Sequence, residues 1–213
     1  MLFSSMTFVF MFLPIVCTAY LLARKDLKNH ILLIASILFY AWGEPRYLAI
    51  MIMTILINYI GANYISRSKK SGHRKWLLGI TIVLDLSFLF YFKYFNFFVE
   101  NVNELFKTNY NFIKVIMPIG ISFYTFQAMS YLVDVYRGEV KVQKDIYKLA
   151  LYICLFPQLI AGPIVKYKDI ESQLAVRKFS PEQTAHGIKR FIYGLSKKLL
   201  IADTVSIAAD HVF

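Results

Sequence analysis

Long uncharged apolar stretches recur along the chain and constrain its fold more than any other feature. Of the 213 residues, 58% are hydrophobic and only 17% are charged, whereas a soluble domain carries about 25% charged residues. The charged residues cluster in short runs between the apolar stretches. A helix needs roughly 20 apolar residues to cross a bilayer. The pattern therefore predicts an all-α, polytopic transmembrane helical bundle rather than a large soluble core.

Five stretches are long enough to cross a bilayer, or nearly so. The second has only 13 uncharged residues, so we expect the bilayer to thin around it. The fourth holds Asp85 and Lys93, about 12 Å apart along a helix, so each needs a partner on another helix. A structural polar pair is favoured over catalysis for these groups. The expected spans are 4–22, 31–43, 47–66, 76–99 and 115–136.

The net charge of +11 indicates membrane orientation rather than nucleic-acid binding. Basic residues are concentrated in the loops at 23–30, 67–75 and 137–148, whereas the loops at 43–46 and 100–114 are neutral. Cytoplasmic loops of membrane proteins carry an excess of Lys and Arg. We therefore predict that the three basic loops are cytoplasmic and that the N-terminus is outside, with no nucleic acid as a partner.

Residues 149–165 interrupt this alternation. The stretch is uncharged but contains Pro157, Gly162 and Pro163. A crossing here would place the next loop, 166–190, outside, although it carries six basic and three acidic residues. A re-entrant segment avoids this conflict, and its non-helical backbone would need cover from protein or from a water-filled cavity. A re-entrant cavity wall and an ordinary kinked sixth span both remain open.

A helical pattern follows at 181–203. Ser180 can cap this helix, and Pro181 suits its first position. Apolar residues then recur at helical spacing with Lys and Arg among them. This pattern predicts an amphipathic helix at the cytoplasmic face, or one that leads into another span.

Neither the two cysteines nor the four histidines form a recognisable site. Cys17 and Cys154 lie in apolar stretches, without the spacing of a disulfide framework or a metal site. No histidine lies in a motif typical of a catalytic base. The sequence therefore predicts no metal site.

The stretch at 117–138 is unusual for a membrane span, and it reads MPIGISFYTFQAMSYLVDVYRG. Its polar side chains suit contacts between helices or the lining of a tunnel. The stretch resembles the membrane-bound O-acyltransferase superfamily, specifically its alginate O-acetyltransferase branch. The same resemblance extends to residues 3–14, 38–45 (LFYAWGEP), 156–165 (FPQLIAGPIV) and 187–203.

The resemblance covers nearly the whole chain. It implies that residues 1–213 are the N-terminal part of a single membrane domain, a shell of helices around a funnel-like tunnel. It implies no bound cofactor and a cytoplasmic acyl donor, acetyl-CoA or another. The implied activity is O-acetylation of an exported cell-surface polysaccharide such as alginate. The implied partners are membrane lipid, the polysaccharide acceptor and an extracytoplasmic polysaccharide-modifying transferase, at the bacterial plasma membrane.

In the family, a membrane-embedded histidine in a Trp-His-Gly context is implicated in catalysis. The only tryptophans here are Trp42 and Trp76, and neither precedes a histidine. We therefore assign no catalytic residue and expect this fragment to be inactive alone. By motif position, the resemblance indicates ten tunnel or substrate-path residues: Pro118, Gly120, Ser122, Gln127, Asp134, Arg137, Pro157, Gln158, Gly162 and Pro163.

Two other functions remain open. Polar groups in broken spans also fit a transporter or channel, but no matching pair of broken segments in inverted halves is found. A membrane scaffold that docks an extracytoplasmic transferase is the third reading.

Overall fold

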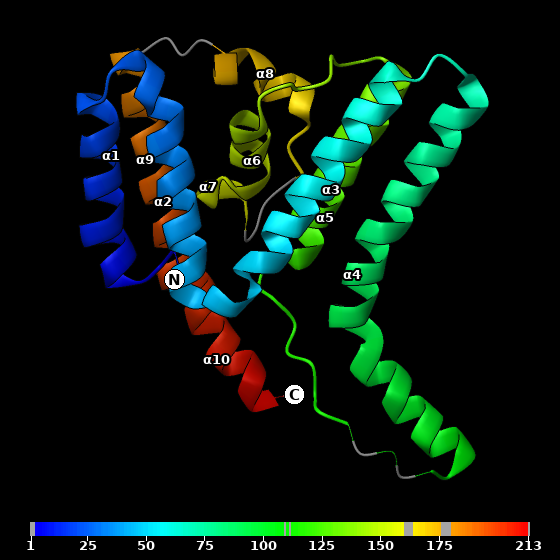
Figure 1. Ribbon diagram of the computed structural model, residues 1–213. Coiled ribbons are helices and arrows are strands. Elements are labelled where there is room, and N and C mark those ends of the chain that lie inside the picture. Colours follow the sequence, from blue (N-terminus) through cyan, green and yellow to red (C-terminus); the bar gives the residue numbers. More distant parts are fainter. Residues whose placement is uncertain (1–2, 109, 111, 160–163, 176–179, 213) are drawn as a thin grey trace. The chain divides into compact units, whose positions relative to one another are not determined.

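The computed structural model is helical throughout its regular elements (Figure 1). It describes residues 3–108, 110, 112–159, 164–175 and 180–212, and no strand occurs among them. The all-α fold predicted from the sequence is confirmed. The chain separates into two compact units, which are described one by one: unit 1 is Met1–Leu22 with Ala175–Phe213, and unit 2 is Ala23–Leu174.

Unit 2 holds seven of the α-helices within the described ranges. Helix α3 packs against α4, α5 and α6, and α2 packs against α6 and α7. Short 3-10 turns precede α2 and α3. The seven helices are α2 (Lys28–Gly43), α3 (Leu48–Arg67), α4 (Ser71–Phe106), α5 (Ile121–Arg137), α6 (Ile146–Cys154), α7 (Phe156–Leu159) and α8 (Tyr167–Ala175).

Two helices of the described chain have the length and apolar composition of transmembrane helices. They are Pro45–Arg67, which joins the preceding turn to α3, and Ser71–Phe106, which is α4. Helices α2 and α5 occupy the second and fifth expected spans, but they have only 16 and 17 residues. The remaining apolar helix, Phe8–Leu22, is also shorter than a typical span.

The contact between α3 and α4 is close and contains a buried polar pair. A methyl group on Gly61 would lie 2.7 Å from the Thr81 hydroxyl oxygen, so the two helices approach closely there. The Asn58 side-chain amide donates to both carboxyl oxygens of Asp85, at 3.0 and 2.9 Å. Asp85 is only 1% exposed. Asn58 is thus the partner on another helix that a carboxyl group in this span requires.

Unit 1 contains two helical stretches, of which the first is apolar and the second begins with a helix that has an apolar side and a polar side. Helix α1 (Leu13–Leu22) follows a π-helical turn, η1 (Phe8–Phe12). The second stretch begins as expected at Pro181, where the Ser180 hydroxyl accepts from the Gln183 N–H. It runs to Val212, beyond the expected 203. Its parts are α9 (Pro181–Lys197), the π-helical turn η4 (Lys198–Ala202) and α10 (Asp203–Val212).

Candidate functional site

The most irregular part of unit 2 is the junction between α6 and α7. Helix α6 starts at a well-formed cap, where the Asp145 carboxylate accepts from the Tyr147 N–H at 3.0 Å. The helix ends at Leu155, whose ψ of 114° is not helical. Pro157 lies just beyond and has no N–H to offer to a preceding carbonyl. The break therefore leaves backbone groups that need partners elsewhere.

Side chains from three other places supply those partners. The Tyr152 carbonyl oxygen accepts from the Gln127 amide at 2.7 Å and from the Gln158 amide at 3.0 Å. The Phe156 N–H donates to the Ser36 hydroxyl at 3.2 Å. An unpaired backbone group buried in an apolar environment costs several kcal/mol, about 2–7 by transfer measurements. Helices α2 and α5 thus stabilise the break, which is built into the fold.

Beyond the break, the chain returns to the end of unit 2 at which α6 begins. The Gln143 amide, just before α6, donates to the Tyr167 hydroxyl at 2.7 Å, at the start of α8. The Tyr152 hydroxyl donates to the Val165 carbonyl at 2.9 Å. The Tyr131 and Tyr167 rings pack with centroids 4.9 Å apart. The segment at 149–165 therefore enters and leaves unit 2 at one end, with 160–163 outside the described residues.

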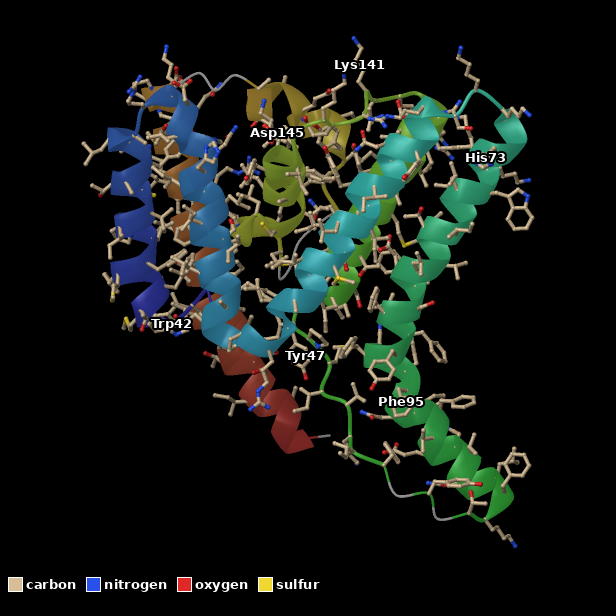
Figure 2. The ribbon with its side chains drawn as sticks, in the orientation of Figure 1. Trp42, Tyr47, His73, Phe95, Lys141 and Asp145 are labelled. Atoms are coloured by element: carbon tan, nitrogen blue, oxygen red, sulfur yellow. The ribbon has the colours of Figure 1, made fainter. Side chains whose placement is uncertain are left out.

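Figure 2 shows which end this is. Asp145 and Lys141 lie at the same end as His73, whereas Tyr47 and Trp42 lie at the opposite end. The end at which the segment enters and leaves therefore carries the loops at 67–75 and 137–148, which are rich in basic residues.

The start of α5 is fixed against α7 by Gly120. This residue has a φ of +77°, in the left-handed region that favours glycine. A Cβ on Gly120 would lie only 2.6 Å from the Leu159 carbonyl oxygen. The preceding N–H, from Ile119, donates to the Glu44 carboxylate at 2.8 Å. Three sequence blocks that carry the family resemblance therefore meet at this point.

Polar groups recur along one side of α5 at spacings of three and four residues. They are Tyr124, Gln127, Ser130 and Asp134, and the outer two are roughly 15 Å apart along the helix axis. The Tyr124 hydroxyl, the Ser130 hydroxyl and one Asp134 carboxyl oxygen are buried and make no hydrogen bond of standard geometry with a described residue. The Tyr124 hydroxyl is nevertheless near the Tyr40 hydroxyl, and the Ser130 hydroxyl is near that of Tyr152. We call the four residues on this side of α5 the α5 polar stripe. Buried polar atoms without partners are uncommon, and they often indicate a site for water or a ligand.

The structure brings several of the predicted substrate-path residues together. Gln127 and Gln158 meet at the Tyr152 carbonyl. Gly120 contacts Leu159, and the buried Pro118 precedes it in the chain, with its carbonyl accepting from Ile121 at 3.3 Å.

The other predicted residues are spread more widely. Ser122 is half-buried on α5, and Pro157 is exposed on α7. Asp134 is 6% exposed, whereas Arg137 is exposed and forms an ion pair with Glu139 at 3.8 Å. Gly162 and Pro163 lie outside the described residues.

Sequence reasoning missed Ser36, Gln143 and Tyr152. No local pattern marks Ser36, because its partner is 120 residues away in the chain. Pro157 does indicate that carbonyls one turn earlier need partners, and that signal leads to the neighbourhood of Tyr152.

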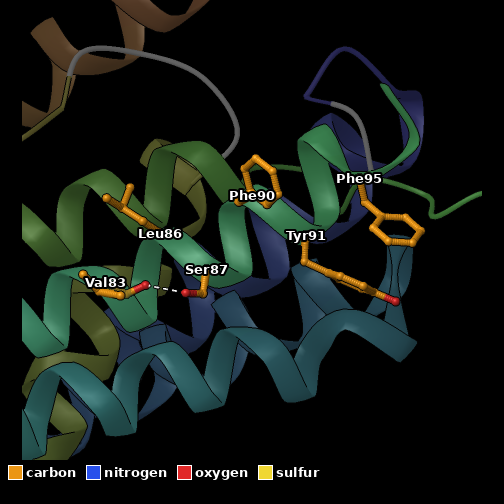
Figure 3. Close-up of a pocket in the computed structure, with 6 residues that line it drawn as sticks. All are labelled: Val83, Leu86, Ser87, Phe90, Tyr91 and Phe95. Carbon is orange, nitrogen blue, oxygen red and sulfur yellow. Dashed lines mark hydrogen bonds between the residues drawn. The ribbon is translucent and has the colours of Figure 1, made fainter. Parts of the chain in front are cut away.

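An apolar hollow elsewhere in unit 2 lacks comparable chemistry. It has a volume of about 480 Å³ and is lined by residues of α4 alone. Figure 3 shows Ser87 in this hollow, with its hydroxyl donating to the Val83 carbonyl of the preceding turn at 2.6 Å. None of the predicted substrate-path residues lines it.

The chain is similar to known proteins along its whole length. It is 40% identical to a probable alginate O-acetylase AlgI of Pseudomonas syringae pv. tomato and 38% identical to that of Pseudomonas aeruginosa. It is 29% identical to a peptidoglycan O-acetyltransferase of Helicobacter pylori. Each alignment covers all of this chain but only 42%, 42% and 46% of the relative.

The chain thus spans less than half the length of the curated relatives it matches. No family model matches the sequence, and no solved structure matches it. The similarity agrees with the resemblance read from the sequence blocks. The chain is therefore homologous, along its whole length, to part of the alginate O-acetylases, the branch of the membrane-bound O-acyltransferases that its motifs resemble.

Proposed function

We propose that the chain is part of a membrane-bound O-acetyltransferase that modifies an exported cell-surface polysaccharide. Similarity along the whole chain to enzymes named for this reaction carries the proposal. The proposed acceptor is alginate or a related polymer, and the proposed donor is acetyl-CoA or another cytoplasmic acyl donor. The proposed partner is an extracytoplasmic polysaccharide-modifying transferase, and the proposed location is the bacterial plasma membrane, crossed several times.

The broken helix and the α5 polar stripe support this proposal. A polar acyl donor and a hydroxyl acceptor that meet within a bilayer need a path lined by polar atoms, since lipid offers no hydrogen bonds. The stripe supplies hydroxyl, amide and carboxyl groups within an apolar helical unit. We propose that the segment at 149–165 is a re-entrant wall of this path, with Pro118, Gly120, Gln127 and Gln158 holding its shape.

A segment exchange tests the function. The part of the Pseudomonas aeruginosa relative that aligns with this chain would be replaced by residues 1–213, in cells that lack the native gene. We expect O-acetyl groups to return to the secreted polymer, whereas residues 1–213 expressed alone should leave it unacetylated. The double change Gln127→Leu and Gln158→Leu should abolish acetylation, because the Tyr152 carbonyl loses both donors.

Asn101→Leu is the matched control for this experiment. Its amide is exposed and, among the described residues, donates only to the Phe97 carbonyl of its own helix, so acetylation should persist. A chimera that reaches the membrane at normal levels but leaves the polymer unacetylated would contradict the proposed function. Full activity of the Gln127 and Gln158 double variant would contradict the proposed role of the break.

Loop accessibility tests the proposed orientation. In a chain with Cys17→Ala and Cys154→Ala, single cysteines would replace Arg46, Lys70 or Lys168. An impermeant maleimide should label Arg46→Cys in intact cells, but it should label Lys70→Cys and Lys168→Cys only after permeabilisation. The reason is the basic character of the loops around residues 70 and 168. External labelling at position 168 alone would make 149–165 an ordinary span.

A further inference from the structure

Helix α4 extends well beyond the end of its neighbour α3. The Tyr47 ring, just before α3, meets the Phe92 ring edge-on with centroids 5.8 Å apart. Phe92 is therefore level with that end of α3. The helical stretch Pro45–Arg67 measures roughly 34 Å, slightly more than the hydrocarbon thickness of a bilayer. Residues 93–106 add roughly 21 Å of helix beyond this level, as Figure 1 shows.

The chain that follows α4 returns along this extension and is braced to it. Asn96 makes two hydrogen bonds with the backbone of Val115, accepting from its N–H at 2.9 Å and donating to its carbonyl at 2.7 Å. Asn103 makes two more with the backbone of Tyr110, at 3.0 and 3.1 Å. We call residues 93–117 the spur, of which 109 and 111 lie outside the described residues. These four hydrogen bonds hold the end of α4 and the returning chain together.

The spur exposes large apolar side chains. Ile113 is 91% exposed, Leu105 is 77% exposed and Ile116 is 68% exposed. A soluble surface rarely displays so many contiguous apolar groups. Other exposed members are Phe97, Phe98, Phe106, Tyr110 and Met117.

The charges and tyrosines of the spur match the polar boundary of a lipid leaflet. Its cations are Lys93, Lys107 and Lys114, and the Lys93 ammonium lies 5.4 Å from the centre of the Tyr94 ring. One of its two acids, Glu100, is paired with Lys114 at 3.4 Å. Tyrosine rings and long cationic side chains concentrate at the headgroup level of membranes.

We propose that the spur is an interfacial anchor that lies in the headgroup and upper acyl region of the phospholipid leaflet at that end of unit 2. Two observations favour lipid over protein as its occupant. The apolar surface of the spur continues the exposed apolar side of α4, which includes Val83, Phe90 and Tyr91. Helix α4 also changes direction in its second half (Figure 1), which turns the spur sideways rather than straight away from α3. The proposal does not depend on acyl transfer.

Fluorescence quenching by brominated lipid tests this anchor. The chain would carry Trp42→Phe and Trp76→Phe, with Ile113→Trp or Ile116→Trp as the single fluorophore, in phosphatidylcholine–phosphatidylglycerol vesicles. Bromine near the headgroup end of the acyl chain should quench either probe about twofold more than bromine near the chain end. Val83→Trp is the matched control, because Val83 is exposed and lies roughly 13 Å inside the level of Phe92 along α4. It should show the reverse order, since α3 and α4 run side by side at that depth.

The other outcomes would overturn the proposal. Strong quenching of both spur probes by aqueous iodide, without quenching by brominated lipid, would place the spur in water. Protection from both quenchers would mean that protein covers it, whether another part of the protein or a second copy. Two spur positions are probed because agreement between them excludes a local defect at either one.

Discussion

Replacement of Gly120 by alanine is expected to destabilise unit 2 by roughly 3 kcal/mol. Two costs add at this position. A φ of +77° is unfavourable for any residue with a Cβ, by about 1–3 kcal/mol. The new methyl group would also lie 2.6 Å from the Leu159 carbonyl oxygen. Backbone cannot rotate away as a side chain can, so α5 and α7 would have to separate.

Two other glycines allow the two costs to be measured separately. Gly138 has a φ of +75°, but a Cβ there would meet no atom within 4 Å, so alanine should cost only the conformational part. Gly79 lies inside α4 with open space around it, and alanine there should be neutral or stabilise by about 0.5–1 kcal/mol. Unfolding of the purified chain in mixed micelles, followed by circular dichroism, gives all three values. Equal losses for the changes at 120 and 138 would mean that the contact with Leu159 is absent.

Asn58→Leu should cost a similar amount, roughly 3 kcal/mol. The Asn58 amide is the one side-chain donor to Asp85 recorded among the described residues. Leucine has a similar volume, so the substitution mainly removes the donor. It leaves a carboxyl group that is 1% exposed without a partner, and an unsatisfied buried group costs more than a hydrogen bond contributes.

A double-mutant cycle distinguishes the buried pair from simple packing. Asp85→Leu removes the group that needs a donor, so the double variant Asn58→Leu with Asp85→Leu should be more stable than Asn58→Leu alone. We expect the recovery to be at least about 1 kcal/mol, since replacing both partners by apolar groups of similar shape is often nearly neutral. The same micelle titration measures it. Additive losses would show that the two side chains do not interact.

The sequence predicted the positions of the helices better than their ends. Helix α3, at Leu48–Arg67, follows the expected span 47–66 closely, because a Gly-Glu-Pro turn and a basic run bound the helix and the apolar stretch alike. Helix α4 begins at Ser71 and ends at Phe106, whereas the expected span was 76–99. Charges mark where an apolar stretch ends, but Lys, Arg and Glu are good helix formers, so the helix continues past them.

Only part of the candidate site could be predicted from the sequence. Pro157 indicated a break or a kink in the segment, and the sequence blocks drew attention to Gly120 and Gln127. The hydrogen-bond partners at the break could not be predicted from the sequence, because Ser36 and Phe156 are 120 residues apart and come together only when the chain folds. The interpretation of 149–165 as a membrane re-entrant wall stays a prediction, and so do the five membrane crossings.

The pairing of Phe156 with Ser36 also bears on how the protein is made. The ribosome releases α2 and α5 before α6 and α7, so Ser36 and Gln127 are already synthesised when the broken segment emerges. Its unpaired backbone groups can then form hydrogen bonds as soon as the segment is inserted, and they do not remain unpaired in lipid until a later helix is made. Because α2 and α5 are made first, the least regular part of unit 2 avoids an unfavourable intermediate in which its backbone groups lie unpaired in the membrane.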